Sequence, residues 1–147
     1  MEKDIINGAL PLEKAQSAEN LSILSLAYMG DAVLEILSRE YVISRSGKVK
    51  PGELVYETKK FITCEAQSDA VARIADILSD DEQDIFRRGR NAKTHFTPKH
   101  GDVIQYRRAT GFEALMGYLY LSGNISRMKE LFTAAYEIKD ARETPTE

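Results

Sequence analysis

The sequence has little cysteine and no long apolar run, and both shortages narrow the class of protein. A single cysteine, Cys64, allows no internal disulfide and no cysteine zinc cluster, which fits a reducing cytoplasm. No run of 18 uncharged apolar residues exists, so we expect no membrane-spanning helix. Residues 1–10 include three charged residues and lack an apolar stretch, so we expect no signal peptide. These absences indicate a cytoplasmic protein with no membrane partner.

Strand-like alternation of polar and apolar residues is also missing, and apolar residues recur instead at helical spacing. At 147 residues the chain is long enough for one domain with a sizeable core. We predict an all-α helical bundle over residues 21–138, preceded by an N-terminal segment, 1–20, and followed by a flexible polar tail, 139–147. The expected helices span residues 22–44, 53–61, 65–78, 80–88, 102–121 and 126–138, with a surface loop at 89–101. Residues 79–82, Ser-Asp-Asp-Glu, form a capping-box pattern.

An excess of positive charge is absent too. The net charge of −3 and the pI of about 5.5 by themselves argue against a nucleic-acid partner. The charge is unevenly distributed, however. Residues 87–108 hold seven basic residues and one acid, so this segment carries +6 and the rest of the chain −9. A basic run is most often a solvated surface, but this concentration favours contact with phosphate groups.

Two acids stand alone in otherwise apolar helices. Asp31 is the sole charged residue in 21–34, and Glu113 is the sole charged residue in 109–121. An ionised carboxylate in an apolar setting costs several kcal/mol unless it is paired or binds a metal. Each acid could pair with a basic residue of another helix or face solvent. Alternatively, the two helices cross and present both acids to a hard cation such as Mg²⁺, which takes carboxylate oxygens and water as ligands.

Glycines beside both acids favour the crossing. Gly30 directly precedes Asp31, and Gly111 and Gly117 lie close to Glu113. A glycine inside a helix costs about 0.5–1 kcal/mol relative to alanine. We therefore expect another group to approach the helix backbone closely at these positions.

Residues 28–34, Tyr-Met-Gly-Asp-Ala-Val-Leu, resemble the signature of the ribonuclease III family, in which an aromatic and an apolar residue precede Gly-Asp-Ser/Ala and two apolar residues. Residues 112–117, Phe-Glu-Ala-Leu-Met-Gly, are similar to the second acidic motif of that family. Residues 87–99 and 106–113 look like landmarks of its Mini-III branch, which has the catalytic domain without a double-stranded-RNA-binding domain. The resemblance spans roughly residues 21–121.

The resemblance implies an all-α endonuclease domain that forms a homodimer and cuts one RNA strand with each subunit. Asp31 and Glu113 are then the catalytic residues and the ligands of a Mg²⁺ ion. The implied substrate is double-stranded RNA, typically the paired ends of precursor large-subunit (23S) ribosomal RNA, with a ribosomal protein on that RNA as a further partner. Tyr28 falls where the family places an aromatic residue at the subunit contact, although a core tyrosine fits this position equally well.

Without a separate RNA-binding domain, the catalytic domain must hold its duplex by itself, through phosphate and 2′-hydroxyl contacts. The basic segment is suited to this task, and we expect it to act from a flexible loop. The candidate RNA-binding residues are Arg87, Arg88, Arg90, Asn91, Lys93 and Lys99.

The acidic positions depart from those of the larger ribonuclease III enzymes. Where these enzymes carry further acids before the first motif, the chain has Leu24 and Ala27, and where they carry an aspartate before the second glutamate it has Thr110. The Mini-III branch shares this economy of carboxylates. Glu35 lies one turn after the first acid and could support the site, but we favour its pairing with Arg39 at i+4.

Three alternatives remain open on the sequence. Residues 90–95 resemble the Arg-Asn-x-x-x-His motif of metal-independent HEPN ribonucleases, in which Arg90 and His95 would act from a helix, but Thr97-Pro98 favours a loop. A non-catalytic RNA-binding or ribosomal scaffold protein could share the fold, although it has no reason to bury bare acids. An all-α Mg²⁺ nucleotide pyrophosphohydrolase needs paired acidic helices, whereas residues 81–84 look structural.

Overall fold

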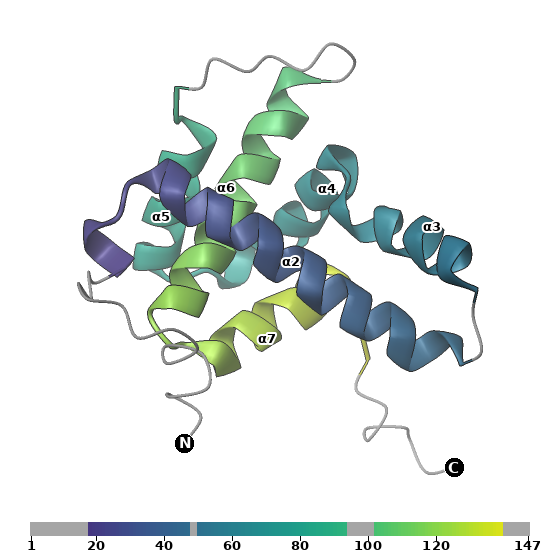
Figure 1. Cartoon of the computed structure of the whole chain (residues 1–147). Coiled ribbons are helices and arrows are strands. Elements are labelled where there is room, and N and C mark those ends of the chain that lie inside the picture. The colour runs from purple at the N-terminus through teal and green to yellow at the C-terminus, as the bar shows by residue number, and fades with distance from the viewer. Residues whose placement is uncertain (1–17, 48–49, 94–101, 140–147) are drawn as a thin grey trace.

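The structure is a computed structural model that describes residues 18–47, 50–93 and 102–139 (Figure 1). No strand occurs in these three stretches, which confirms the predicted all-α fold. The elements are η1 (Ala18–Asn20), α2 (Ile23–Ser46), α3 (Pro51–Ile62), α4 (Cys64–Ile74), η2 (Ala75–Ile77), α5 (Asp80–Arg90), α6 (Val103–Leu121) and α7 (Ile125–Ala135). None of these helices is long and apolar enough to cross a membrane. Most of the predicted segments 1–20 and 139–147 lies outside the described residues.

Side chains that accept hydrogen bonds from free backbone N–H groups mark the start of most helices. Ser22 does so at the start of α2, Thr63 at the start of α4 and Asp102 at the start of α6. α5 begins with the predicted capping box, in which Ser79 and Glu82 each accept a hydrogen bond from the backbone N–H of the other. These caps explain why the helices begin close to the positions that the sequence predicts.

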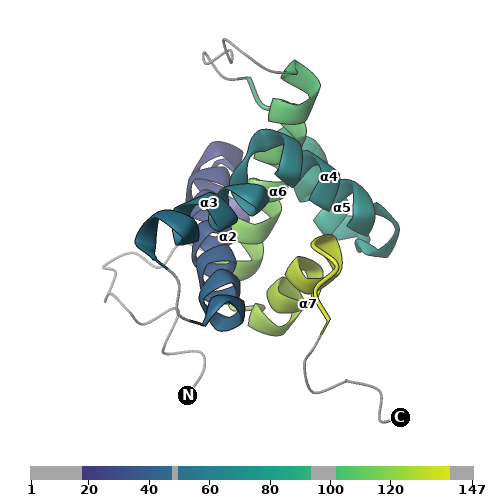
Figure 2. The same ribbon diagram turned by 90° about the vertical axis from the view of Figure 1, so that its right-hand side faces the viewer.

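α6 is the central helix and contacts α2, α4, α5 and α7 (Figures 1 and 2). Phe112, Leu115 and Met116 of α6 are fully buried and lie in the core. α2 crosses α6 on one side, and α5 packs on another side. The position of any functional residue on α2 or α5 therefore depends on how closely that helix approaches α6.

The crossing of α2 and α6 leaves no room for side chains between the two backbones. A Cβ atom built on Gly30 would lie 1.6 Å from the carbonyl oxygen of Glu113, and one on Gly117 would lie 1.9 Å from the carbonyl oxygen of Leu26. Both distances are far below van der Waals contact, so only glycine fits at these two positions. The predicted close approach is confirmed, and the approaching group is the backbone of the other helix.

α5 packs against α6 through a second pair of glycines. A Cβ atom on Gly89 would lie 2.8 Å from the Cα atom of Gly111. α5 continues to Arg90, so the predicted end near residue 88 and the predicted start of the loop at residue 89 are wrong. The reason is that Gly89 permits close helix packing here, whereas the sequence analysis took it as a helix stop.

The ends of two other helices also differ from the prediction. α4 ends at Ile74 and continues as the 3₁₀ turn η2, whereas one helix was expected over residues 65–78. α7 ends at Ala135 and not near residue 138. Glu137 adopts a φ of 54°, a left-handed conformation that terminates helices.

A largely buried ion pair joins α5 to α7. Arg127 donates from Nε and Nη2 to the two carboxylate oxygens of Glu82, at 2.9 and 2.8 Å. The Glu82 side chain is 7% exposed, and the hydrogen bonds from Arg127 hold its pKa below the usual range despite that burial. Asp84 in turn pairs with Arg87 on the surface of α5. Glu82 and Asp84 thus form stabilising ion pairs, in agreement with the prediction that residues 81–84 have a structural role.

Candidate active site

The α2–α6 crossing brings the two lone acids together. Asp31 follows Gly30 on α2, and the backbone of Glu113 on α6 lies directly against that glycine. The two side chains interact through their charges and through a hydrogen bond. Two residues that are far apart in the sequence therefore form one acidic pair, as the crossing hypothesis predicted.

The two acids have different surroundings. Glu113 is half-buried, whereas Asp31 is exposed to solvent, so the expectation of an acid held in apolar surroundings holds only for Glu113. Burial raises the pKa of Glu113 to about 8, and the negative charge of Asp31 and the hydrogen bond with it act in the same direction. Within the described part of the chain, neither acid forms an ion pair with a lysine or arginine. Among the described residues, an ion pair with a basic residue of another helix therefore does not explain why the two acids lie in these helices.

The acidic pair fits a hard divalent cation. A cation beside two carboxylates removes the repulsion between them and favours the ionised form of Glu113. In residues 18–47, 50–93 and 102–139 no group of three or more His, Cys, Asp or Glu side chains is arranged to hold a metal. The pair can thus supply two oxygen ligands, and water or phosphate oxygens would complete the shell, a mixture that Mg²⁺ readily accepts.

Neighbouring positions add no further acid to the pair. Thr110 is buried and its hydroxyl donates to the carbonyl oxygen of Tyr106 at 3.0 Å. Leu24 is exposed on α2. Glu35 accepts a hydrogen bond from Arg39 at 2.6 Å, which confirms the i+4 pairing favoured for it.

Two side chains that the sequence analysis did not connect with the acids interact electrostatically with Glu113. Partial burial and the charge of Glu113 raise the pKa of the Cys64 thiol at the start of α4. Tyr136 donates its hydroxyl to the carbonyl oxygen of Phe61 at 2.7 Å, and burial, with a smaller effect from Glu113, raises its pKa. Neither residue belongs to a recognisable motif, so the sequence offered no signal for this proximity.

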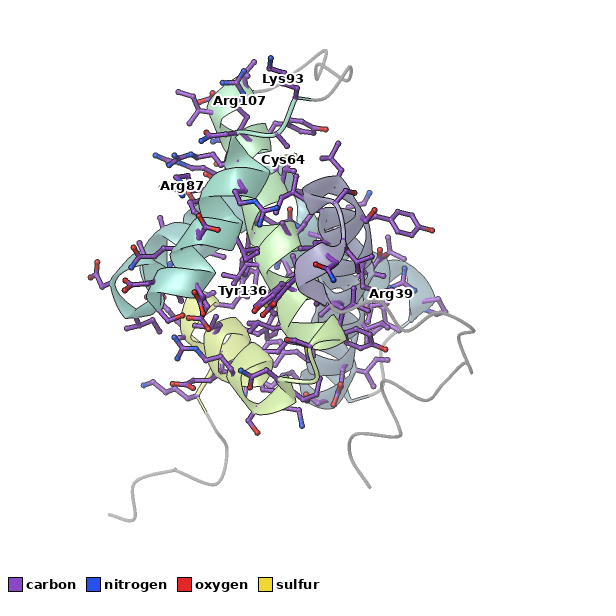
Figure 3. All side chains as sticks on the ribbon, turned by 90° about the vertical axis from the view of Figure 1, so that its left-hand side faces the viewer. Arg39, Cys64, Arg87, Lys93, Arg107 and Tyr136 are labelled. Carbon is purple, nitrogen blue, oxygen red and sulfur yellow. The ribbon has the colours of Figure 1, made fainter. Side chains whose placement is uncertain are left out.

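The predicted RNA-binding side chains gather at one end of the molecule. Those that the structure describes are all exposed: Arg87, Arg88, Arg90, Asn91 and Lys93. The three arginines lie on the last turns of α5, so the loop expected from residue 89 is wrong for Arg90, whereas Arg87 and Arg88 lie on the helix predicted over residues 80–88. Figure 3 shows Arg87, Lys93 and Arg107 in the same upper part of the molecule. Arg107 lies on α6, so two helices contribute to this basic end.

Two of the predicted residues, Lys99 and His95, lie outside the described residues. α5 ends at Arg90, and residues 91–93 are not helical. The described part of the chain therefore lacks the continuous helix after Arg90 that the HEPN motif requires.

Tyr28 lies on the surface of α2 with 82% of its side chain exposed, so the interpretation as a core tyrosine is wrong. Other exposed apolar residues share this face of the helix. We call them the α2 stripe: Leu24, Tyr28, Ala32, Ile36 and Ile43. Asp31 lies beside the stripe, since it follows Leu24 by about two turns.

Known proteins match most of the chain. The model of the family described as "Ribonuclease III domain" matches residues 24–124. A protein named Mini-ribonuclease 3 from a Thermoanaerobacter species is 44% identical over 120 residues, which cover 81% of this chain and 83% of the relative. A protein of the same name from Staphylococcus aureus is 37% identical over 124 residues, covering 83% of this chain and 92% of the relative.

A similar fold occurs in a solved structure. A crystal structure of a protein from Fusobacterium nucleatum superimposes with a TM-score of 0.73 and 27% sequence identity. The match covers 83% of this chain and 97% of that protein. The helical arrangement described above is thus shared along almost the whole length of an experimentally determined protein.

Proposed function

Because the chain belongs to the ribonuclease III family, among the Mini-ribonuclease 3 proteins, and is an endoribonuclease, we propose that Asp31 and Glu113 form its catalytic metal site. Enzymes of this family act on double-stranded RNA and generally depend on a divalent metal. We propose Mg²⁺ as that metal and hydrolysis of duplex RNA, with 5′-phosphate and 3′-hydroxyl products, as the reaction. The comparisons favour this function over a non-catalytic scaffold protein.

The observation that carries the proposal is the meeting of the two acids at the α2–α6 crossing. Asp31 is exposed and accessible to RNA, whereas Glu113 is half-buried and fixed by the backbone contact with Gly30. The two carboxylates supply fixed oxygen ligands on one side and leave the solvent side open to substrate. Asp31 and Glu113 would hold the Mg²⁺ ion there, and the ion would supply a lowered pKa for bound water and compensation for negative charge on the phosphodiester.

The basic end of the molecule would hold the duplex. Arg87 and Arg88 on α5, and Lys93 after it, offer exposed positive charges to phosphates. Arg90, Asn91 and Lys99 belong to the same proposed contact set. Because these groups contact the backbone of RNA, they position the duplex without reading its sequence.

We further propose that the α2 stripe is the contact between two subunits. A run of exposed apolar side chains along one helix is unusual on an isolated domain and typical of a subunit contact. Tyr28 projects from this stripe close to Asp31. A two-fold contact through the stripe would therefore place both acidic pairs near the interface, where each could act on one strand.

For the cellular substrate we propose the paired ends of precursor 23S ribosomal RNA, with a ribosomal protein bound to the RNA as a partner. The similarity to the Mini-ribonuclease 3 proteins supports this proposal.

The test is cleavage of an end-labelled RNA duplex by wild type, Asp31→Asn and Glu113→Gln, each with Mg²⁺ and with EDTA. These substitutions keep the shape of the side chains and remove the charge that binds the ion. We expect cleavage only by wild type with Mg²⁺ and at least a hundredfold loss in each variant. Glu35→Gln serves as a matched control, because Glu35 pairs with Arg39 outside the acidic pair. Cleavage that survives EDTA and both substitutions would overturn the metal site and point to His95.

A further inference from the structure

A second pocket lies away from the acidic pair, between the α4–η2 segment, α5 and the start of α6. Its volume is about 610 Å³, which is large enough for a small organic ligand. Four of its lining residues are apolar and come from the α4–η2 segment and the residue after it, and we call them the apolar floor: Val71, Ala72, Ala75 and Leu78. Its rim is charged, because α5 and α6 contribute three arginines and two aspartates.

The three arginines differ in how they are held. Arg87 pairs with Asp84, and the guanidinium of Arg90 lies over the ring of Phe86 at 5.8 Å. Arg108, from α6, has no hydrogen bond or ion pair within the described part of the chain. A guanidinium with free donors at the edge of a pocket is a suitable partner for a phosphate group.

The walls of the pocket are rigid. A Cβ atom on Gly111 would lie 2.7 Å from the Cδ2 atom of Phe86, so this ring is pressed against the α6 backbone. Gly89 and Gly111 hold α5 and α6 in contact, and both helices contribute residues to the lining of the pocket. The pocket is thus preformed, which lowers the entropic cost of binding a ligand.

The pocket and the acidic pair use different faces of α6. Arg108 precedes Glu113 by five residues, which corresponds to a rotation of roughly 140° around the helix. Substrate groups held by the acidic pair therefore do not fill the pocket, and a ligand in the pocket leaves the acidic pair open.

We infer that this pocket binds a single nucleotide, with the base on the apolar floor and the phosphate at Arg108 and Arg90. Asp80 and the Asp84 carboxylate, which also line the pocket, can accept hydrogen bonds from amino groups of the base. The nucleotide can come from either of two sources, an unpaired nucleotide at the end of the RNA duplex or a free nucleotide. The first source rests on the proposed function, and the second does not.

The test compares two pocket variants with two matched controls, all in the Glu113→Gln background so that RNA is bound without being cut. Arg108→Gln removes the free charge, and Ala72→Phe fills the apolar floor without changing any charge. Arg107→Gln removes the neighbouring charge on the same helix, and Ala134→Phe adds the same ring at an exposed alanine of α7; neither residue lines the pocket. Each variant is titrated with a blunt RNA duplex, with the same duplex carrying one unpaired 3′ nucleotide per strand, and with adenosine 5′-monophosphate.

If the nucleotide comes from RNA, the unpaired end increases affinity about tenfold, and both pocket variants abolish this preference while both controls keep it. Arg107→Gln can weaken both duplexes equally, because it removes one phosphate contact. If the source is a free nucleotide, the monophosphate binds once per chain, and both pocket variants remove this binding. The inference is overturned if neither form of binding occurs, or if the pocket variants behave like the controls. A chain that binds no duplex refutes the RNA proposal, and the monophosphate titration still decides the pocket.

Discussion

The acidic crossing and the basic end of the molecule are built in opposite ways. At the crossing, two backbones touch at Gly30 and Gly117, and a half-buried Glu113 meets Asp31 without a basic partner in the described residues. At the basic end, three exposed arginines lie on α5, and the exposed Lys93 follows it. The acids are fixed by main-chain geometry, whereas the basic side chains can each adjust to a phosphate.

The two regions therefore differ in how tightly the fold fixes their side chains. Under the proposed function, the acidic pair at the crossing must keep its metal ligands in fixed positions, and the close packing of the two backbones holds them there. A non-sequence-specific grip on RNA requires many weak, exchangeable charges. Substitutions should therefore have large effects at the crossing and small effects at the basic end.

Gly30→Ala should have the largest effect of the substitutions considered. Its Cβ would lie 1.6 Å from the carbonyl oxygen of Glu113, and a backbone atom cannot move aside as a flexible side chain can. We expect a loss of about 3–5 kcal/mol of unfolding free energy. Urea denaturation would measure it. Gly52→Ala is the matched control, because nothing lies within 4 Å of its added Cβ, and equal stability of the two variants would refute the packing argument.

Glu82→Gln should follow, since it removes the charge that Arg127 pairs with through two hydrogen bonds and leaves Arg127 only the exposed Glu130 as an acidic partner among the described residues. We expect a loss of about 2–3 kcal/mol at neutral pH. Asp84→Asn breaks the exposed pair with Arg87 and should cost at most about 1 kcal/mol. A similar loss in both variants, measured by thermal denaturation, would show that burial does not strengthen the Glu82 pair.

The same pair predicts a pH dependence. The pKa of Glu82 is lowered in the fold, so its stabilisation is present above the pKa of the unfolded chain and is lost as the pH falls through the folded value. The difference in stability between wild type and Glu82→Gln should thus shrink in acid. A constant difference from neutral pH down to strongly acidic conditions would contradict this sign.

In the absence of metal, Glu113→Gln should raise the stability of the fold, whereas Glu82→Gln lowers it. The folded pKa of Glu113 is raised from 4.5 to about 8, so the stability that its proton confers is complete below 4.5 and lost as the pH rises through 8. In EDTA at pH 8 the variant should be more stable than wild type by about 1–2 kcal/mol. Added Mg²⁺ should raise the melting temperature of wild type alone. If Glu113→Gln is less stable than wild type under these conditions, the ionised Glu113 does not destabilise the fold.

Arg88→Gln should have the smallest effect, in keeping with the adjustable basic end. We expect stability within about 0.5 kcal/mol of wild type and a loss of about one unit in the salt dependence of duplex binding. Arg45→Gln, at the far end of α2, is the control and should leave that slope unchanged. A loss of duplex affinity greater than tenfold for Arg88→Gln would show that the basic end depends on single residues as strongly as the crossing does.

The sequence predicted the features that depend on local patterns. Apolar spacing and capping side chains determine helices over short stretches, so the all-α fold and the Ser79–Glu82 capping box are confirmed. Two lone acids with neighbouring glycines also predicted a crossing that the structure contains. The same glycine pattern misled at Gly89, because a glycine can end a helix or allow close packing, and the local sequence does not distinguish the two.

The sequence analysis did not predict features that depend on how several helices pack together. Cys64 and Tyr136 come near Glu113 only because α4 begins and α7 ends beside α6. The nucleotide-sized pocket depends on three segments whose residues carry no common motif. The exposure of Tyr28 likewise follows from which face of α2 turns toward α6.

The contact between Gly30 and Glu113 also has a consequence for the order of events during synthesis. The first acid leaves the ribosome early on α2, but its partner arrives on α6, after most of the chain has been made. Long-range contacts of this kind form late, once intervening segments have been ordered. An unfinished chain therefore has no paired acids, so under the proposed function it cannot cut the RNA around it until α6 has packed against α2.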